Sequence, residues 1–187
     1  MVKLESLQKL KKGDKAPDFK LLGIDDKKYS LNDFKDAKAL MIIFMCNHCP
    51  YVKAKTDVMN KLYEKFHDKG LVMVGINAND PEDYPDDSFG NMKRFAYEKG
   101  IKFYYLVDET QKVAKNYGAS CTPDPFLFKN VDGEFKLVYH GRFDNAMEPG
   151  DEATSKEMED AIESILKNKE VKKAFVPSIG CSIKWRE

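Results

Sequence analysis

Cysteine is scarce in this sequence, with four residues in a chain of 187, and this scarcity excludes a fold built on many disulfide bonds. The four stand at unequal intervals, as Cys46, Cys49, Cys121 and Cys181. A structural zinc site of four cysteines needs two close pairs, and Cys121 and Cys181 do not form a second one. The sequence therefore leaves one close pair, Cys46 and Cys49, to carry any sulfur chemistry.

Long apolar runs and an excess of either charge are also missing. No run approaches the ~20 residues of a membrane-spanning helix. The lysine-rich opening, residues 1–19, has no apolar core like that of a secretory signal. Basic and acidic residues balance at 31 each, so the formal net charge is zero and neither nucleic acid nor an anionic membrane is an expected partner. We therefore expect a soluble, cytoplasmic protein.

The chain shows no internal repeat and no linker of biased composition. Its length suits one core with extensions, so we expect a single domain over 1–187. Residues 1–12 form an N-terminal extension. Residues 171–187 form a C-terminal tail that packs on the domain, because a free tail would expose Ile179 and Trp185 to water.

Apolar patterning predicts an α/β fold. Residues 39–45 are a continuous apolar run, typical of a strand that is covered on both faces, and 71–77 are a second such strand. The helical spacing over 51–68 connects them, which indicates a right-handed crossover and a parallel pair. Further along, the pattern predicts helices at 88–99, 110–118 and 153–168, a strand at 103–108, and strands at 121–130 and 134–143 joined by a tight turn.

The pair Cys46-Asn47-His48-Cys49 lies between the first apolar strand and the helix. A dithiol that cycles through a disulfide needs sulfurs that can reach ~2.05 Å and one thiol with a lowered pKa. A helix N-terminus provides unpaired N–H groups and a positive dipole end for that thiolate. The position therefore favours a redox dithiol over a metal site or two inert core thiols.

The order of elements and motifs resembles the thioredoxin-like superfamily. It runs strand, C-x-x-C-P, helix and strand, and then Thr-Pro entering a strand hairpin before a final helix. The segments "GDKAPDF", "DETQKVAKNYGASCTPDPFLF" and "LVYHGRFD" are similar to the AhpC/TSA (redoxin) branch, in its members that carry C-x-x-C. The resemblance covers about residues 13–170. It implies a thioredoxin-like fold, with a central mixed β-sheet flanked by helices, an N-terminal β extension and a mid-chain insertion.

The resemblance also implies roles for particular residues. Cys46 matches the exposed nucleophilic cysteine, and Cys49 matches the resolving cysteine that attacks the mixed disulfide. Pro123 matches a cis-proline that faces the dithiol, and Thr122 offers backbone groups to an extended substrate strand. The expected substrates are protein or small-molecule disulfides, with a cellular thiol reductant closing the cycle and no tightly bound cofactor.

Two features of the motif set it apart from thioredoxin. His48 occupies the position of a thioredoxin proline, and a cationic imidazole beside a thiolate would lower the thiol pKa and stabilise the reduced form. This predicts a dithiol more oxidising than that of thioredoxin, whose potential is ~−270 mV. Leu40 replaces a buried acid of thioredoxin, so the proton acceptor for Cys49 is unassigned. Pro50 cannot donate a helical hydrogen bond, so the helix can begin at Pro50 itself, with its dipole acting on Cys49 as well as on Cys46.

Two other functions remain open. A peroxiredoxin-like thiol peroxidase would carry Pro-x-x-x-Thr-x-x-Cys, but Ile43 stands where that threonine would be, although Arg142 could serve as the later arginine that holds a peroxide. Copper-carrying proteins of this fold use C-x-x-x-C-P and a distant histidine, and here the cysteine spacing is one residue shorter and His140 lies in a predicted strand. We expect no metal site.

Two remaining cysteines and one acidic segment lie outside these motifs. Cys121 stands two residues before Pro123, and is either a third redox thiol or a small buried filler. Cys181 can reach the dithiol only if the tail crosses that face, which we do not expect. The acidic stretch at 80–87 is expected to be a solvated surface loop.

Overall fold

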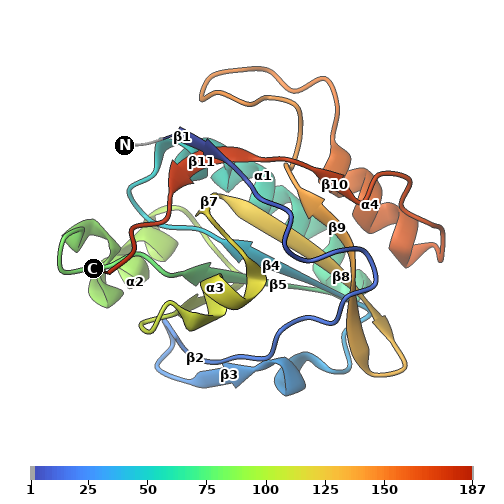
Figure 1. Ribbon diagram of the computed structural model, residues 1–187, viewed down its shortest axis with the longest axis horizontal. Helices are drawn as coiled ribbons and strands as arrows, with labels where there is room; N and C mark the ends of the chain where they lie inside the picture. The colour runs from blue at the N-terminus through green and yellow to red at the C-terminus, as the bar shows by residue number, and fades with distance from the viewer. Residues whose placement is uncertain (1–2, 187) are drawn as a thin grey trace.

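An eight-stranded mixed sheet forms the centre of the computed structural model, which describes residues 3–186 (Figure 1). The strands lie in the order β10-β9-β8-β4-β5-β6-β2-β3. No helix in this part of the chain has the length and apolar character needed to cross a membrane. The strands are β1 (Lys3–Glu5), β2 (Lys20–Gly23), β3 (Lys28–Ser30), β4 (Ala39–Phe44), β5 (Leu71–Asn77), β6 (Tyr104–Val107), β7 (Cys121–Thr122), β8 (Asp124–Val131), β9 (Glu134–Gly141), β10 (Phe175–Val176) and β11 (Ile179–Ser182). The helices are α1 (Pro50–Phe66), α2 (Phe89–Glu98), α3 (Lys112–Tyr117) and α4 (Glu157–Leu166), with short 3-10 turns η1 (Leu31–Phe34), η2 (His67–Lys69) and η3 (Pro85–Asp87).

Strand β4 lies in the interior of the sheet and is buried on both of its faces. Met41 and Ile43 belong to the core on one face, while Leu40, Ile42 and Phe44 belong to the core on the other. The alternation follows from the two-residue period of a strand, and both sets are apolar because both faces are covered. The predicted strand at 39–45 is confirmed, together with its parallel pairing to β5.

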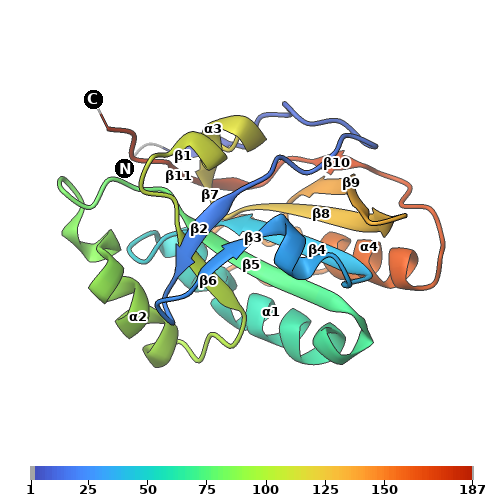
Figure 2. The ribbon, with the colours of Figure 1, turned by 90° about the horizontal axis from the view of Figure 1, so that it is seen from below.

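The helices divide between the two faces of the sheet. On one face α1, α2 and α4 bury apolar side chains against the sheet, among them Met59, Phe95 and Ile162. Helix α3 covers the opposite face, where Tyr117 is fully buried. Figure 2 shows α3 on one side of the sheet and α1 on the other. Burial of each large apolar side chain stabilises the fold by about 1.5–3 kcal/mol. The apolar clusters on the two faces of the sheet are therefore the main source of stability.

A second, three-stranded sheet joins the two ends of the described chain. Strand β11 pairs antiparallel with both β1 and β7, in the order β1-β11-β7 (Figure 1). Leu4 lies opposite Gly180, and Cys181 lies opposite Thr122. The C-terminal segment therefore runs across the edge of the domain at which the chain enters β8.

Three segments differ from the sequence expectations. The strand expected over 121–130 is divided into β7 and β8 by Pro123, whose peptide bond to Thr122 is cis. The last helix begins at Glu157 rather than at residue 153. The acidic insertion is only partly a surface loop, because Asp80 and Asp87 are buried. That expectation was wrong because an Asp-rich composition does not show where the hydrogen-bond partners of each carboxylate lie.

Gly141 at the end of β9 allows a close backbone contact with the C-terminal segment. Its φ of 141° lies in the region that favours glycine, and a Cβ there would overlap the carbonyl of Val176 in β10.

We expect Gly141→Ala to lower the free energy of unfolding by about 1–3 kcal/mol, measured by chemical denaturation. Gly90→Ala is the matched control, since a Cβ at Gly90 meets no neighbouring atom. Equal stability of the two variants would contradict a structural requirement for glycine at 141.

Candidate functional site

The two cysteines of the C-x-x-C motif lie between the end of β4 and the start of α1. Cys49 is the N-cap residue of α1, and Pro50 is the first helical residue. Proline is well suited to that position because the N–H that it lacks would have no helical partner. The positive end of the helix dipole therefore acts directly on Cys49. This is the arrangement predicted for a helix that begins at Pro50.

Thr122 contacts both cysteines of the motif. Its side-chain Oγ1 lies 3.3 Å from the Sγ of Cys46. Its backbone carbonyl oxygen lies 3.3 Å from the Sγ of Cys49, and accepts a hydrogen bond from that sulfur when Cys49 is protonated. The cis peptide bond to Pro123 follows directly in the chain. The fold thus brings the Thr122-Pro123 pair next to the dithiol. Cys49 and Thr122 are 73 residues apart in the sequence.

Cys181 reaches the same place from the C-terminal strand β11. Its Sγ lies 2.7 Å from the Sγ of Cys49. The expectation that the tail does not bring Cys181 to the dithiol was wrong, because β11 pairs with β7 and places Cys181 opposite Thr122. Cys46, Cys49 and Cys181 together are called the sulfur cluster below.

The lowered thiol pKa belongs to Cys49 rather than to Cys46. Hydrogen bonding from Cys46, and then from Cys181, outweighs burial and lowers the pKa of Cys49 to about 5. Burial raises the pKa of Cys46 well above its ordinary value, and the charge of Asp87 raises it further. Burial also raises the pKa of Cys181 to about 12. Of the three sulfurs, Cys49 is therefore the one whose ionisation its thiol neighbours favour.

All members of the sulfur cluster are buried. Cys46 and Cys49 are 0% exposed, and Cys181 is 3% exposed. The exposed position that the resemblance implied for Cys46 is wrong, because Thr122 and the C-terminal segment occupy the space around the dithiol. A substrate disulfide can reach these sulfurs only if the covering segment moves.

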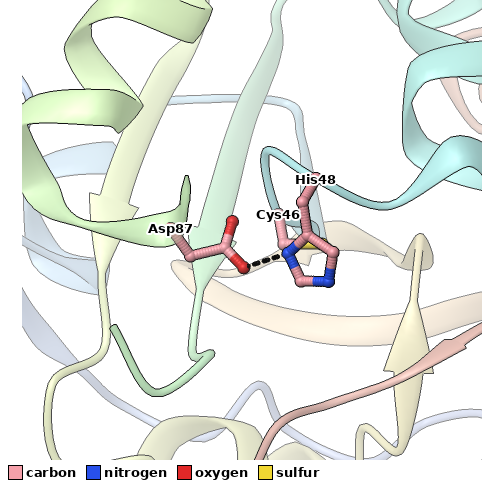
Figure 3. Close-up of side chains that lie close together, drawn as sticks. All are labelled: Cys46, His48 and Asp87. Carbon is pink, nitrogen blue, oxygen red and sulfur yellow. Dashed lines mark hydrogen bonds and ion pairs between the residues drawn. The ribbon is translucent and has the colours of Figure 1, made fainter. Parts of the chain in front are cut away.

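His48 is paired with a carboxylate instead of acting as an isolated cation beside the dithiol. Its Nδ1 lies 2.6 Å from Oδ2 of Asp87, and Figure 3 shows the carboxylate pointing toward the imidazole. The imidazole also stacks on the ring of Tyr84, with centroids 5.5 Å apart. The expected lowering of the Cys46 pKa by His48 was wrong, because burial raises this pKa and the hydrogen bond with Cys49 and the charge of Asp87 raise it further.

Asp87 is a site residue that sequence reasoning missed. Its carboxylate accepts hydrogen bonds from the backbone N–H of Asn47 and from the side chain of Asn79, both at 2.7 Å. Burial raises the pKa of Asp87, but hydrogen bonds from His48, Asn79 and Asn47 more than offset this and lower it overall. The side chain is 2% exposed, so this is a buried ionised acid held behind the C-x-x-C loop. Its position in an Asp-rich stretch gave no sequence signal that separates it from its solvated neighbours.

Cys46, His48 and Asp87 could also offer donors to a metal ion. One ligand atom from each lies within 4.8 Å of the others (Figure 3). The set mixes thiol, imidazole and carboxylate, and in this arrangement Nδ1 of His48 is already hydrogen-bonded to Asp87. A metal ion bound by Nδ1 of His48 and Oδ2 of Asp87 would have to replace the hydrogen bond between them.

The other candidate residues lie outside the sulfur cluster. Cys121 is buried in β7, where burial and then Asp124 raise its pKa, so it stays a protonated thiol. Arg142 donates to Oε1 of Glu157 from both Nε and Nη2, and lines a groove beside Pro123 together with Tyr51. His140 is fully buried, with its Nε2 2.7 Å from the carboxylate of Asp124. Cys121 and His140 are buried in the domain core, whereas Arg142 lines the groove beside Pro123.

Comparison with known proteins places the chain in a family. Residues 12–137 match the AhpC/TSA family. The thiol-disulfide oxidoreductase ResA of Bacillus thuringiensis (strain Al Hakam) is 29% identical over 131 residues, which are 70% of this chain and 69% of that protein. Peroxiredoxin Q of Populus jackii, a chloroplastic protein, is 30% identical over 152 residues, covering 76% of this chain and 66% of its own length.

Solved structures extend the likeness over the whole chain. An uncharacterized conserved protein from Geobacillus kaustophilus is 41% identical, covers 100% of this chain and 97% of its own, and has a TM-score of 0.93. A putative thiol:disulfide interchange protein from Chlorobium tepidum and a thioredoxin domain from Bacteroides vulgatus superpose with TM-scores of 0.65 and 0.57. Their identities of 23% and 22% show the fold alone, which is the expected thioredoxin-like one.

The hydrogen bond from Cys46 can be tested through the pKa of Cys49. We expect Cys46→Ala to raise this pKa from about 5 by about one unit or more, because the largest stabilising contact of the thiolate is removed. Cys46→Ser is the matched control, since its hydroxyl can still donate, and should retain most of the lowering. The measurement is a pH titration of thiolate absorbance in the ultraviolet. A low-pKa titration that persists in Cys49→Ser would assign the thiolate to another cysteine.

The buried acid predicts a pH dependence of stability. Because folding lowers the pKa of Asp87 from its ordinary 3.8, its contribution is present above that pH and is lost as the pH falls below it. At pH 7 we expect Asp87→Asn to reduce the free energy of unfolding by about 1–3 kcal/mol, since charged hydrogen bonds are replaced by neutral ones. The difference from the unmodified protein should shrink as denaturation is measured below pH 4. Asp57→Asn, on the exposed face of α1, is the control. A difference that does not change with pH would exclude ionised Asp87 as its source.

Proposed function

We infer that this chain, which belongs to the AhpC/TSA family, is a thiol-disulfide oxidoreductase. The observation that carries the function is the Cys46–Cys49 pair at the N-terminus of α1, with both sulfurs in contact with Thr122 before a cis-proline. The ResA relatives carry the same activity in their names. The enzyme exchanges electrons between its dithiol and substrate disulfides.

We propose that Cys46 and Cys49 are the two catalytic cysteines. Cys49 is the thiolate of the resting reduced site, and in exchange one sulfur of the pair forms a mixed disulfide with the substrate before the other displaces it. Because Cys46 is hydrogen-bonded to Cys49, a proton can pass between the two sulfurs, and this lets Cys46 serve as the attacking thiolate. The exchange leaves the Cys46–Cys49 disulfide and a reduced substrate.

His48 and Asp87 are positioning residues in this proposal. The Asp87 carboxylate holds the Asn47 backbone and the His48 ring together, which fixes the loop that carries both cysteines. The low pKa of Cys49 stabilises the reduced dithiol, so it supports the expected potential above that of thioredoxin. The negative charge that stabilises the reduced form is on Cys49, the resolving cysteine at the N-terminus of α1.

Disulfide substrates fit the surface beside Pro123. A groove there has apolar contacts from Tyr51, Phe143 and Met147. Its lining also includes basic and acidic side chains, which are Lys55, Arg142, Asp144 and Glu148. We propose that this groove receives the peptide or small molecule whose disulfide is exchanged beside Pro123, and that the Thr122 backbone orients it only after β11 has moved away from β7. A thiol reductant returns the dithiol to its reduced form. The cytoplasmic location expected from the sequence stays a proposal.

Peroxide reduction is the second candidate, supported by the likeness to peroxiredoxin Q. Against it, the position three residues before Cys46 is Ile43, which has no hydroxyl, and the guanidinium of Arg142 is paired with Glu157.

Two serine variants separate the two functions. We expect Cys49→Ser to reduce insulin disulfides, with dithiothreitol as the final reductant, at close to the uncatalysed rate, because Cys49 is the sulfur in contact with both other cysteines of the cluster. Cys46→Ser should lose most of the activity, because it removes the partner sulfur within the motif. Cys121→Ala is the control, a buried cysteine outside the sulfur cluster, and should stay within about twofold of the unmodified enzyme. Peroxide consumption that survives in Cys49→Ser, with no insulin reduction by the unmodified protein, would favour the peroxidase.

A further inference from the structure

The C-terminal strand occupies the backbone position beside the dithiol. Strand β11 pairs antiparallel with β7, and Cys181 lies opposite Thr122. Gly180 allows the close approach, because a Cβ there would overlap the carbonyl of Thr122. The place next to Thr122, where a substrate strand was expected, is thus taken by a segment of the same chain that itself carries a cysteine.

Within the sulfur cluster, Cys181 contacts the sulfur of Cys49. The Sγ of Cys181 is 2.7 Å from the Sγ of Cys49, while the Sγ of Cys46 faces Oγ1 of Thr122. A disulfide bond is about 2.05 Å long, so Cys49 and Cys181 need only a small approach to bond. Cys49 therefore has a possible sulfur partner on the C-terminal strand as well as in its own motif.

Hydrogen bonds hold the C-terminal segment on both sides of Cys181. Before it, the carbonyl of Ser178 accepts the N–H of Ser6 at 2.9 Å. After it, Ile183 donates to the carbonyl of Ser120 at 3.0 Å, and Lys184 donates to the side-chain oxygen of Asn79 at 2.9 Å. Because both flanks are fixed to different parts of the domain, Cys181 is presented to Cys49 at high effective concentration.

We propose that Cys181 is a third redox thiol, which takes over the disulfide from Cys46 by exchange at Cys49. The proposal rests on the oxidoreductase function, which supplies the Cys46–Cys49 disulfide. The Cys181 thiolate attacks the Cys49 sulfur, the Cys49–Cys181 bond forms, and the Cys46–Cys49 bond breaks. The electron pair leaves with Cys46, which takes up the proton that Cys181 gave up, so no further oxidant or reductant is consumed.

The exchange changes what covers the site. A Cys49–Cys181 disulfide ties β11 covalently to the start of α1, and Cys46 becomes a thiol again beside Thr122. The oxidised enzyme thereby holds its oxidising equivalent on the C-terminal strand. Reduction of that bond removes the covalent tie, and β11 is then held by strand pairing and hydrogen bonds alone, as in the structure with free thiols.

Peptide mapping of the oxidised full-length protein tests the exchange. The protein is oxidised with oxidised glutathione, quenched in acid, alkylated and digested with trypsin, which releases residues 39–53 with Cys46 and Cys49 and residues 174–184 with Cys181. We expect the main oxidised product to be 39–53 linked to 174–184, with one alkylated cysteine in 39–53. In Cys46→Ser the same linked pair should form.

Each alternative product contradicts a different proposal. An internal disulfide in 39–53, with Cys181 alkylated, overturns the exchange to Cys181 and leaves the oxidoreductase function intact. No disulfide at either place contradicts the oxidoreductase function itself, which the insulin assay measures separately. Both products are detected in one digest, so the two failures are distinguishable.

Two glycine variants test whether the pairing of β11 presents the thiol. We expect Gly180→Ala to lower the linked share by about tenfold or more, because displacement of β11 lowers the effective concentration of Cys181 at Cys49. The internal disulfide of 39–53 should rise in its place. Gly90→Ala, where a Cβ meets no neighbouring atom, is the matched control and should keep the share of the unmodified protein. An unchanged share in Gly180→Ala would overturn the role of β11.

Discussion

The contacts of Thr122 are the constraint on which the rest of the site depends. One residue of a two-residue strand meets Cys46 through its hydroxyl, Cys49 through its carbonyl and Cys181 through strand pairing. The cis peptide bond that follows leads the chain into β8, which pairs with β4 in the centre of the sheet. The sulfur cluster is therefore fixed to the most deeply buried part of the fold, and its geometry does not rely on exposed loops.

Charge at the site is arranged so that one sulfur carries it. Cys49 stands at the helix N-terminus and receives hydrogen bonds from two thiols, whereas Cys46 is fully buried near the carboxylate of Asp87. Negative charge is stabilised at the first position and disfavoured at the second. In thioredoxin a buried acid precedes the first cysteine on its strand, and this chain has Leu40 there. Here the buried acid near the dithiol comes from the mid-chain insertion, on the side of His48.

Local sequence patterns were sufficient for most of the fold. The two apolar runs and the helix between them predicted β4, α1 and β5, because an apolar strand without alternation must be covered on both faces. The C-x-x-C-P motif gave the position of the dithiol and allowed the helix to begin at Pro50. Asp87 and Cys181 could not be found in this way. An acid in an Asp-rich stretch has the same local signal whether it is buried or solvated, and Cys181 meets Cys49 across 132 residues of sequence.

The sequence by itself therefore determined the fold class, the family resemblance and the pair of cysteines that carries the chemistry, because these depend on local spacing and apolar periodicity. Only the tertiary structure decided which sulfur holds the thiolate, which acid stands behind the loop, and that a third cysteine completes the cluster. These depend on burial and on hydrogen bonds between distant segments. The energies of such contacts are set by distances that no local pattern encodes.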